Sequence, residues 1–188
     1  MVTAHLVESG GHRLSDIRWD DPHFTTGYDG NLAYGQSKTA NVLFAVELDR
    51  RWGNDGIHGY AVHPGIIHGT NLGPYIAEGE VRTDSLSDDD QRAMGLIDDS
   101  GRPIIDPDRE KKTPQQAAST IVFAATSPLL AEIGGVYLKD NDISRLDDAP
   151  STIAIGTEPV VATDVVPHAI DPGSAQRLWA LSEQLLKA

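Results

Sequence analysis

The stretch that decides the fold reads LAYGQSKTANVLFAVELDRRWGNDGIHGYAVHPG and covers residues 32–65. Its first part spaces apolar residues close to the helical period and contains no proline, which predicts a long helix over residues 32–51. Glycines then end this helix. The residues that follow predict a β-strand over residues 57–62, which stops at Pro64 because proline cannot donate to a sheet ladder.

The same alternation continues on both sides of this stretch. The further predicted elements are strands over residues 2–8 and 135–138 and helices over residues 114–125 and 173–187. The signals for the helix that begins at residue 114 are Thr113 as a cap, Pro114 at the first position and Gln116 to complete a capping box. Alternating strands and helices favour an α/β fold with a parallel sheet. We therefore expect the three strands to be parallel neighbours, with helices 34–51 and 114–125 packed on their faces.

The remaining segments predict little regular structure. Residues 12–31 are polar and rich in turn residues, which predicts a loop. Residues 78–112 form an acidic excursion, with one short helix expected near residues 87–94. Residues 141–166 have a weak pattern that allows an extra hairpin near residues 153–161. We expect one domain over residues 1–188, in which the acidic segment is a mobile substrate loop.

Composition excludes several classes of function. The chain has 15 Lys and Arg residues against 28 Asp and Glu residues, a net charge of −13. This charge disfavours nucleic acid and anionic membranes as partners. No apolar run approaches the roughly 18 residues that a membrane span needs, and residues 1–10 lack the basic region of a signal peptide. There is no cysteine, so disulfides and thiolate catalysis are excluded. We expect a soluble cytoplasmic protein.

Tyr34 and Lys38 are the first candidate site residues. Their spacing of four puts both on one face of the predicted helix, one turn apart. A nearby ammonium group lowers the pKa of a phenol from about 10 and favours its ionised form. Such a tyrosine can exchange a proton with a substrate oxygen. On its own, the pair is more typical of a solvated helix face with a tyrosine packed at its edge.

The context of this pair resembles a known family. The segments LAYGQSKTANVLFAVEL and AVHPGIIHGTNL are similar to the short-chain dehydrogenase/reductase family, in the branch of retinol-dehydrogenase-like and WW-domain-oxidoreductase-like proteins. The segments TPQQAAS, ATSPLL, GGVYL and LWALSE fit the same branch. The resemblance implies the C-terminal part of a Rossmann-like, doubly wound parallel sheet. It also implies hydride transfer between NAD or NADP and an alcohol, aldehyde or ketone.

The resemblance also implies roles for individual residues. Tyr34 would be the general acid/base, and Lys38 would hold the nicotinamide ribose hydroxyls and lower the pKa of Tyr34. Ser9 would hydrogen-bond the substrate oxygen as its charge changes. The residues that would position the nicotinamide are Pro64, Gly65 and Thr70. Glu8 departs from the family's Val-Ser-Ser pattern at this point, and the alternative interpretation of Ser9 is a plain turn serine beside two glycines.

The dinucleotide fingerprint of the family, a glycine-rich turn between a strand and a helix, does not occur in the 188 residues. We therefore expect the C-terminal half of a dehydrogenase, without the strands that hold adenine and pyrophosphate, and no turnover by this chain alone. An alternative is a non-catalytic remnant that serves as an interaction or assembly module. The resemblance implies that the helix over residues 34–51 can pair with a second copy.

Other site chemistries have weaker support. Seven histidines make a metal site conceivable, but no HExxH motif occurs, and we expect no metal. A serine hydrolase would need GxSxG, which is absent. The acidic segment lacks the regular spacing of a calcium loop.

Overall fold

The computed structural model describes residues 2–67, 87–93, 95–148 and 163–187. The elements of the N-terminal part are β1 (Val2–Val7), the 3-10 turn Gly10–Arg13, α1 (Gly30–Trp52), β2 (Ile57–His63) and β3 (Ile66–Ile67). The elements that follow are α2 (Asp88–Ala93), β4 (Lys111–Lys112), α3 (Pro114–Thr126), β5 (Val136–Lys139), β6 (Asp142–Ile143) and α4 (Pro172–Leu185), with 3-10 turns at Gly53–Asp55, Pro107–Arg109, Pro128–Leu130 and Pro167–Ile170.

The main sheet has the strand order β1-β2-β5-β6 within the described residues. The first three strands are parallel, with Val7 opposite Val62 and Val62 opposite Leu138. This confirms the predicted neighbouring parallel strands and the α/β fold class. Strand β6 was not predicted; it runs antiparallel to β5 because Asp140 and Asn141, both at positive φ, turn the chain back.

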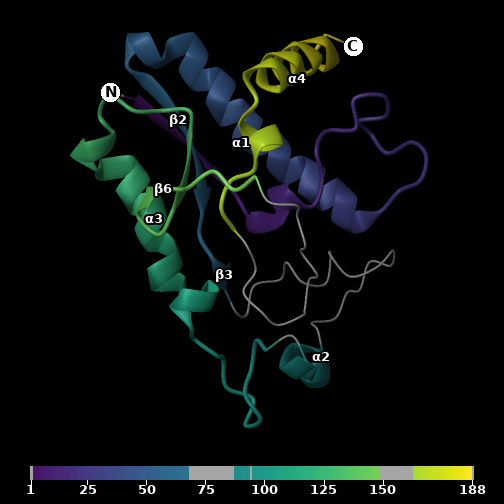
Figure 1. The fold of residues 1–188 in the computed structure, drawn as a ribbon, viewed down its shortest axis with the longest axis vertical. Coiled ribbons are helices and arrows are strands. Elements are labelled where there is room, and N and C mark those ends of the chain that lie inside the picture. Colours follow the sequence, from purple (N-terminus) through teal and green to yellow (C-terminus); the bar gives the residue numbers. More distant parts are fainter. Residues whose placement is uncertain (1, 68–86, 94, 149–162, 188) are drawn as a thin grey trace.

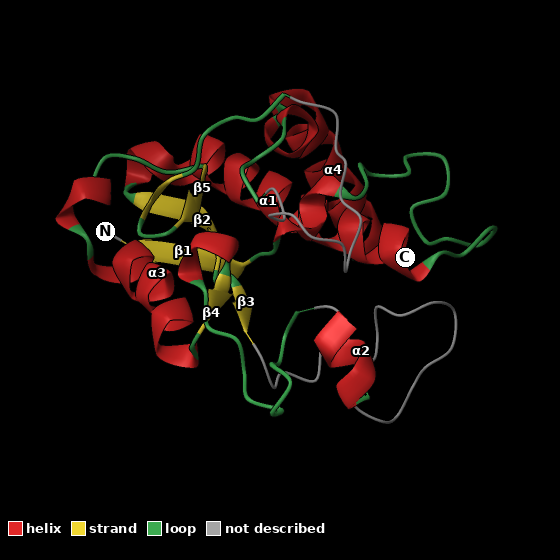
Figure 2. Cartoon of the chain, turned by 60° about the horizontal axis from the view of Figure 1, so that its bottom comes forward, coloured by secondary structure: helices red, strands yellow, loops and turns green. Residues whose placement is uncertain are grey.

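Helices cover both faces of the sheet, as the sequence predicted, and Figure 2 shows α1 and α3 on opposite sides of the strands. Side chains alternate along a strand, so Ala61 faces one helix while Tyr60 and Val62 face the other. The buried cluster on the α1 side is Val42, Ala45, Ala61, Tyr137, Val165, Val166 and Ala169. The cluster on the α3 side is Tyr60, Val62, Ala124, Leu130 and Leu138. Two packed faces therefore hold the sheet in place.

Both long helices begin at side-chain caps. Thr113 and Gln116 form the predicted capping box at the start of α3. Helix α1 begins at Gly30, earlier than predicted, because the Asp29 carboxylate accepts hydrogen bonds from the backbone N–H groups of Asn31 and Leu32. A shorter loop than expected therefore precedes the helix that carries Tyr34. The last helix, α4, packs across α1 (Figure 1).

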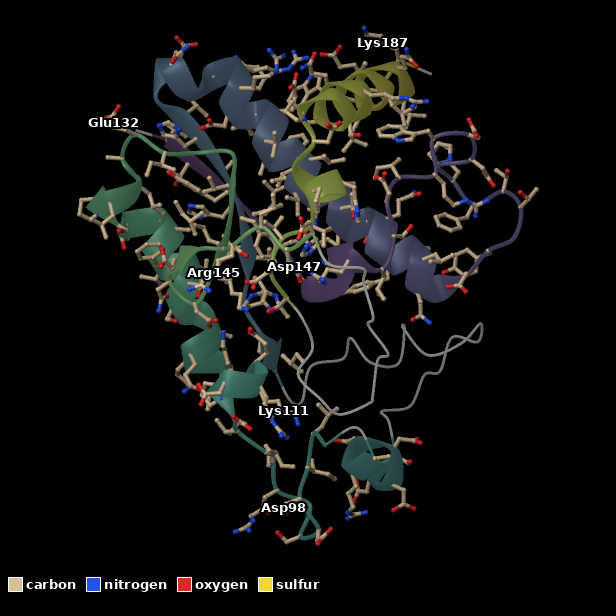
Figure 3. The ribbon with its side chains drawn as sticks, in the orientation of Figure 1. Asp98, Lys111, Glu132, Arg145, Asp147 and Lys187 are labelled. Carbon is tan, nitrogen blue, oxygen red and sulfur yellow. The ribbon has the colours of Figure 1, made fainter. Side chains whose placement is uncertain are left out.

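The described part of the acidic segment contains regular structure. Helix α2 corresponds to the short helix predicted near residues 87–94. The tip of this segment is a turn in which Asp98 accepts bonds from Ser100 and Arg102, at the far end of the molecule in Figure 3. Strand β4 then pairs in parallel with β3, a contact that the sequence did not predict. The hairpin predicted near residues 153–161 lies outside the described residues.

Candidate active site

Ser9 lies just beyond the carboxyl end of β1, where the chain enters the 3-10 turn Gly10–Arg13. Its backbone is extended, and its hydroxyl oxygen accepts a hydrogen bond from Gly11 N at 3.1 Å. Ser9 is therefore the cap of this turn, which fixes the position of its hydroxyl group. The turn-serine interpretation is correct as a description of the local structure, and it leaves room for a second role because Tyr34 lies beside it.

Tyr34 lies against the same turn. A Cβ atom added to Gly11 would come within 2.4 Å of Tyr34 Cε1 and 3.4 Å of Ser9 Oγ. The Ser9 side chain is close enough to the phenol to lower its pKa. Glycine at position 11 thus allows the Tyr34 ring to approach the Ser9 turn closely.

Lys38 lies one helical turn beyond Tyr34. Its ammonium nitrogen is 5.6 Å from the centre of the Tyr34 ring and donates to the Val7 carbonyl over 3.5 Å. The structure therefore brings Ser9, Tyr34 and Lys38 together at the carboxyl end of β1. A hydrogen bond of 3.5 Å to a carbonyl oxygen is long, and an ammonium group has three N–H donors. Lys38 can therefore also donate to a ligand.

The pKa of Tyr34 departs from the expectation. Burial raises it above the usual 10.0, and a charge on Glu8 raises it further, while the hydrogen bond with Ser9 lowers it. The net direction is opposite to the lowering that the resemblance implied for Lys38. The physical reason is that desolvation of the partly buried ring outweighs the lowering effect of the Ser9 side chain.

Pro64 and Gly65 follow the carboxyl end of β2, directly beside the Ser9 turn, because Glu8 N donates to Val62 O at 2.7 Å. Gly65 has a φ of +86°. A Cβ atom at this position would lie 2.7 Å from the Lys112 side chain and 2.9 Å from the Glu110 carbonyl oxygen. The segment at residues 110–112, which follows the acidic loop, therefore borders this end of the sheet. Thr70 lies outside the described residues.

Sequence reasoning missed a buried charged cluster around Glu110. This carboxylate is 3.5 Å from His63 Nε2, 3.4 Å from Lys112 Nζ and 3.0 Å from Lys139 Nζ. It also accepts a hydrogen bond from Thr163 at 2.8 Å. No sequence motif predicts this cluster, because its members come from four separate segments. In the structure, the backbone at Glu110 is left-handed, with a φ of 64°.

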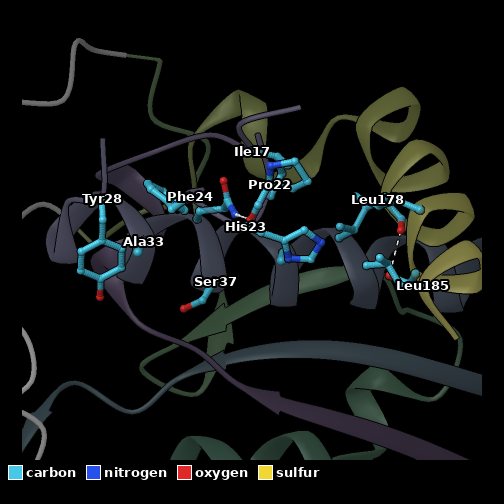
Figure 4. Close-up of a pocket in the computed structure, with 13 residues that line it drawn as sticks. Ile17, Pro22, His23, Phe24, Tyr28, Ala33, Ser37, Leu178 and Leu185 are labelled. Carbon is cyan, nitrogen blue, oxygen red and sulfur yellow. Dashed lines mark hydrogen bonds between the residues drawn. The ribbon is translucent and has the colours of Figure 1, made fainter. Parts of the chain in front are cut away.

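A cavity of about 350 Å³ lies on another side of α1. Figure 4 shows it between the loop that precedes α1, the helix itself and α4. Its apolar lining residues are Ile17, Pro22, Phe24, Ala33, Ala40, Leu178, Leu181 and Leu185. Ser9, Tyr34 and Lys38 do not line it, so this cavity is separate from the candidate catalytic residues.

Two further features bear on the choice of chemistry. Among the described residues, no group of three or more His, Asp or Glu side chains is placed to hold a metal ion. His58 is paired instead with Asp49 at 2.7 Å, and His63 with Glu110. No helix within the described ranges combines the length and the apolar character that crossing a membrane requires.

Comparisons with known proteins agree with this arrangement of motifs. A protein of Streptomyces lividans described as "Probable oxidoreductase" is 39% identical over 184 residues, which cover 97% of this chain and 54% of that protein. Short-chain dehydrogenase/reductase prx1 of Penicillium roqueforti is 29% identical over 96% of this chain and 45% of its own length. Human retinol dehydrogenase 14 is 27% identical over 96% of this chain and 43% of its own length. Over nearly all of its length, the chain is similar to proteins of the short-chain dehydrogenase/reductase family.

The fold agrees with solved structures as well. A crystal structure of an uncharacterized protein from Mycobacterium paratuberculosis matches all of this chain and 51% of its own length, with a TM-score of 0.56 and 26% identity. The chain thus spans about half the length of the curated relatives it matches. This coverage agrees with the expected partial Rossmann-like sheet. No family model matches the sequence.

Proposed function

We propose that this chain carries the proton-transfer part of an NAD(P)-dependent oxidoreductase site, which interconverts an alcohol with an aldehyde or ketone. The single observation that carries the proposal is the packing of the Tyr34 ring against the Ser9 turn, with the Lys38 ammonium nitrogen 5.6 Å from the centre of that ring. An oxidoreductase relationship is shown by the relatives. The substrate class and the roles of the residues are our own assignment.

In this proposal, Tyr34 passes a proton to or from the substrate oxygen, and Ser9 hydrogen-bonds that oxygen. The Ser9 hydroxyl accepts from Gly11 N, so its own proton is available to a substrate oxygen or to Tyr34. Lys38 supplies a fixed positive charge near the phenol. That charge stabilises the phenolate once a bound substrate has displaced water from the site.

The residues present fit the nicotinamide end of a dinucleotide. Lys38 offers ammonium donors of the kind that ribose hydroxyls accept, and Pro64 and Gly65 are the backbone beside which the ring would lie. When bound, the cofactor would supply or accept the hydride, which is chemistry that side chains cannot provide. Thr70 is assigned to the same end on the sequence resemblance.

The test is Tyr34→Phe, assayed by the reduction of a panel of aldehydes with NADH and NADPH in the longest form of the protein that shows turnover. Loss of the proton-transfer group should lower the rate about 10²–10⁴-fold. The matched control is Tyr28→Phe, because Tyr28 is 69% exposed and lies at the other side of α1. Unchanged rates in Tyr34→Phe would exclude Tyr34 as the acid/base and favour the assembly-module alternative.

A further inference from the structure

Glu8 is a buried acid at the centre of the candidate site. Its side chain is 2% exposed, and one carboxyl oxygen accepts a hydrogen bond from Ser9 N at 2.8 Å. The other oxygen, Oε2, is buried without a hydrogen-bond partner in the described part of the chain. Side chains alternate along β1, so Glu8 faces the same side as Leu6, which packs in the cluster beneath α1.

The ionisable groups that face Glu8 come from two elements. From α1 these groups are Tyr34 and Lys38, and from β5 the group is Tyr137. Tyr137 is 2% exposed, and its hydroxyl group also lacks a partner among the described residues. The rings of His12 and His63 lie 4.9 Å and 6.3 Å from the Tyr137 ring. Glu8 therefore interacts electrostatically with both the acid/base candidate and the buried Tyr137.

Burial decides the protonation state of this acid. Desolvation raises the pKa of Glu8 from 4.5 to about 9, against the opposing effects of the Ser9 N–H and the Lys38 ammonium group. A carboxyl group in this environment is neutral at pH 7. At neutral pH it therefore adds no negative charge beside the phenol of Tyr34.

We propose that Glu8 is a positioning residue of this site, and that the charge on its carboxyl group sets how readily Tyr34 releases its proton. The inference rests on the proposed function of Tyr34. While Glu8 holds its proton, the Lys38 ammonium nitrogen lies 5.6 Å from the centre of the Tyr34 ring, and its positive charge favours ionisation of the phenol. Once Glu8 ionises, its negative charge opposes the phenolate and attracts Lys38. The acid thus limits the alkaline range in which Tyr34 can act as a base.

The first test measures the ionisation of Tyr34 in the full chain by NMR of isotope-labelled tyrosine, with Tyr34→Phe to assign the signal. Glu8→Gln keeps the size of the side chain and an oxygen that can accept from Ser9 N, but it can carry no charge. We expect its Tyr34 to titrate at a lower pH, with severalfold more phenolate than wild type at the same alkaline pH. The control is Glu132→Gln, at an exposed carboxylate.

Two outcomes of this experiment overturn the proposal. One is a Tyr34 titration that is the same in Glu8→Gln and in wild type. The other is an equal shift in Glu132→Gln, which would reflect net charge alone. Glu8→Ser provides a second neutral variant, and we expect it to lower the pKa of Tyr34 in the same direction. A shift in Glu8→Gln that Glu8→Ser reverses would show an effect of shape and would also overturn the proposal.

The second test needs no titration of tyrosine. A carboxyl group whose pKa is raised by folding destabilises the folded state as pH rises from 4.5, and the penalty is complete near pH 9. Glu8→Gln should therefore gain stability relative to wild type across this range in urea unfolding. A constant difference from pH 4.5 to pH 9 would show that Glu8 does not retain its proton. These readouts stand apart from the activity of Tyr34→Phe, so failure of the proposed function and failure of this inference are distinguishable.

Discussion

Glu110 joins segments that are far apart in the sequence. It is 4% exposed, and its carboxylate lies within 3.5 Å of His63, Lys112 and Lys139. Burial on its own would raise the pKa of this carboxyl, but the neighbouring His63, Lys139 and Thr163 side chains hold it well below the usual 4.5. The ionised carboxylate therefore ties the segment after the acidic loop to the carboxyl ends of β2 and β5.

Glu110→Gln should be strongly destabilising at neutral pH. It leaves the buried Lys112 ammonium group and the half-buried Lys139 ammonium group with less compensation. Breaking a buried ion pair costs about 3–5 kcal/mol. A carboxyl with a depressed pKa stabilises above its unfolded pKa, and this contribution is lost as pH falls through the folded value. The difference from wild type in urea unfolding should therefore shrink as pH falls below 4.5.

The control for this prediction is Asp108→Asn, which removes an exposed carboxylate from the turn just before Glu110. It should change the free energy of unfolding by about 0.5 kcal/mol or less. An equal loss of stability in Glu110→Gln at pH 7 and in acid would show that charge is not the cause.

At the scale of the element, α1 links the candidate site to the core of the sheet. Its N-terminal turns carry Tyr34 and Lys38, and its middle buries Val42 and Ala45 against β2. The approach is close, because a Cβ atom at Gly59 on β2 would lie 2.6 Å from the Ala45 carbonyl oxygen. The distance between the helix and the sheet thus depends on a glycine in the strand.

Gly59→Ala should separate α1 from β2 and destabilise the protein. The backbone of α1 cannot yield as a flexible side chain would, so we expect a loss of about 1–3 kcal/mol, as for other overpacked sites. Thermal or urea unfolding would measure it. Gly30→Ala is the matched control, because the nearest atom to its added Cβ is 4.0 Å away. Equal stability of the two variants would contradict the close packing.

At the scale of the whole molecule, net charge and the exposed edge of the sheet influence what the chain can bind. The chain carries a net charge of −13, and a nicotinamide dinucleotide is itself anionic. Strand β1 pairs with β2 on one side only within the described residues, and Val2 and Val7 are 64% and 49% exposed. Exposed strand edges favour association with other chains.

We expect the 188-residue chain to bind NAD(H) and NADP(H) no tighter than about millimolar, without measurable turnover. The contacts proposed here reach only the nicotinamide end, and they must offset several kcal/mol of lost freedom on binding. Dinucleotide affinity in this kind of fold comes largely from a glycine-rich turn at a helix N-terminus, which the sequence lacks. Calorimetry on the purified chain is the measurement, and Lys38→Met should remove the residual signal. Micromolar binding would contradict this prediction.

Local patterns in the sequence were enough for the long elements and for the pairing of Tyr34 with Lys38. Helix α1, the capping box of α3 and the three parallel strands all depend on residues close together in the chain. The position of Ser9 beside Tyr34 followed from the family resemblance, because the loop between them has no periodic pattern. The start of α1 was misplaced, since Asp29 and Gly30 also suit a turn. Strand β6 and the pairing of β3 with β4 were not predicted.

The sequence by itself determined the fold class, the family and the candidate acid/base pair, because hydrophobic periodicity and short motifs are local properties. The tertiary structure decided which charges are buried and which groups face them. Glu8 is visible in the sequence as a departure from the family pattern, but the raised pKa of its carboxyl group depends on burial in the folded chain. In the sequence, Glu110 is one of many acidic residues in an acidic segment. It links separate segments only because Lys139 and Thr163 fold against it. Burial and pairing of charges depend on contacts across the chain, which no local pattern encodes.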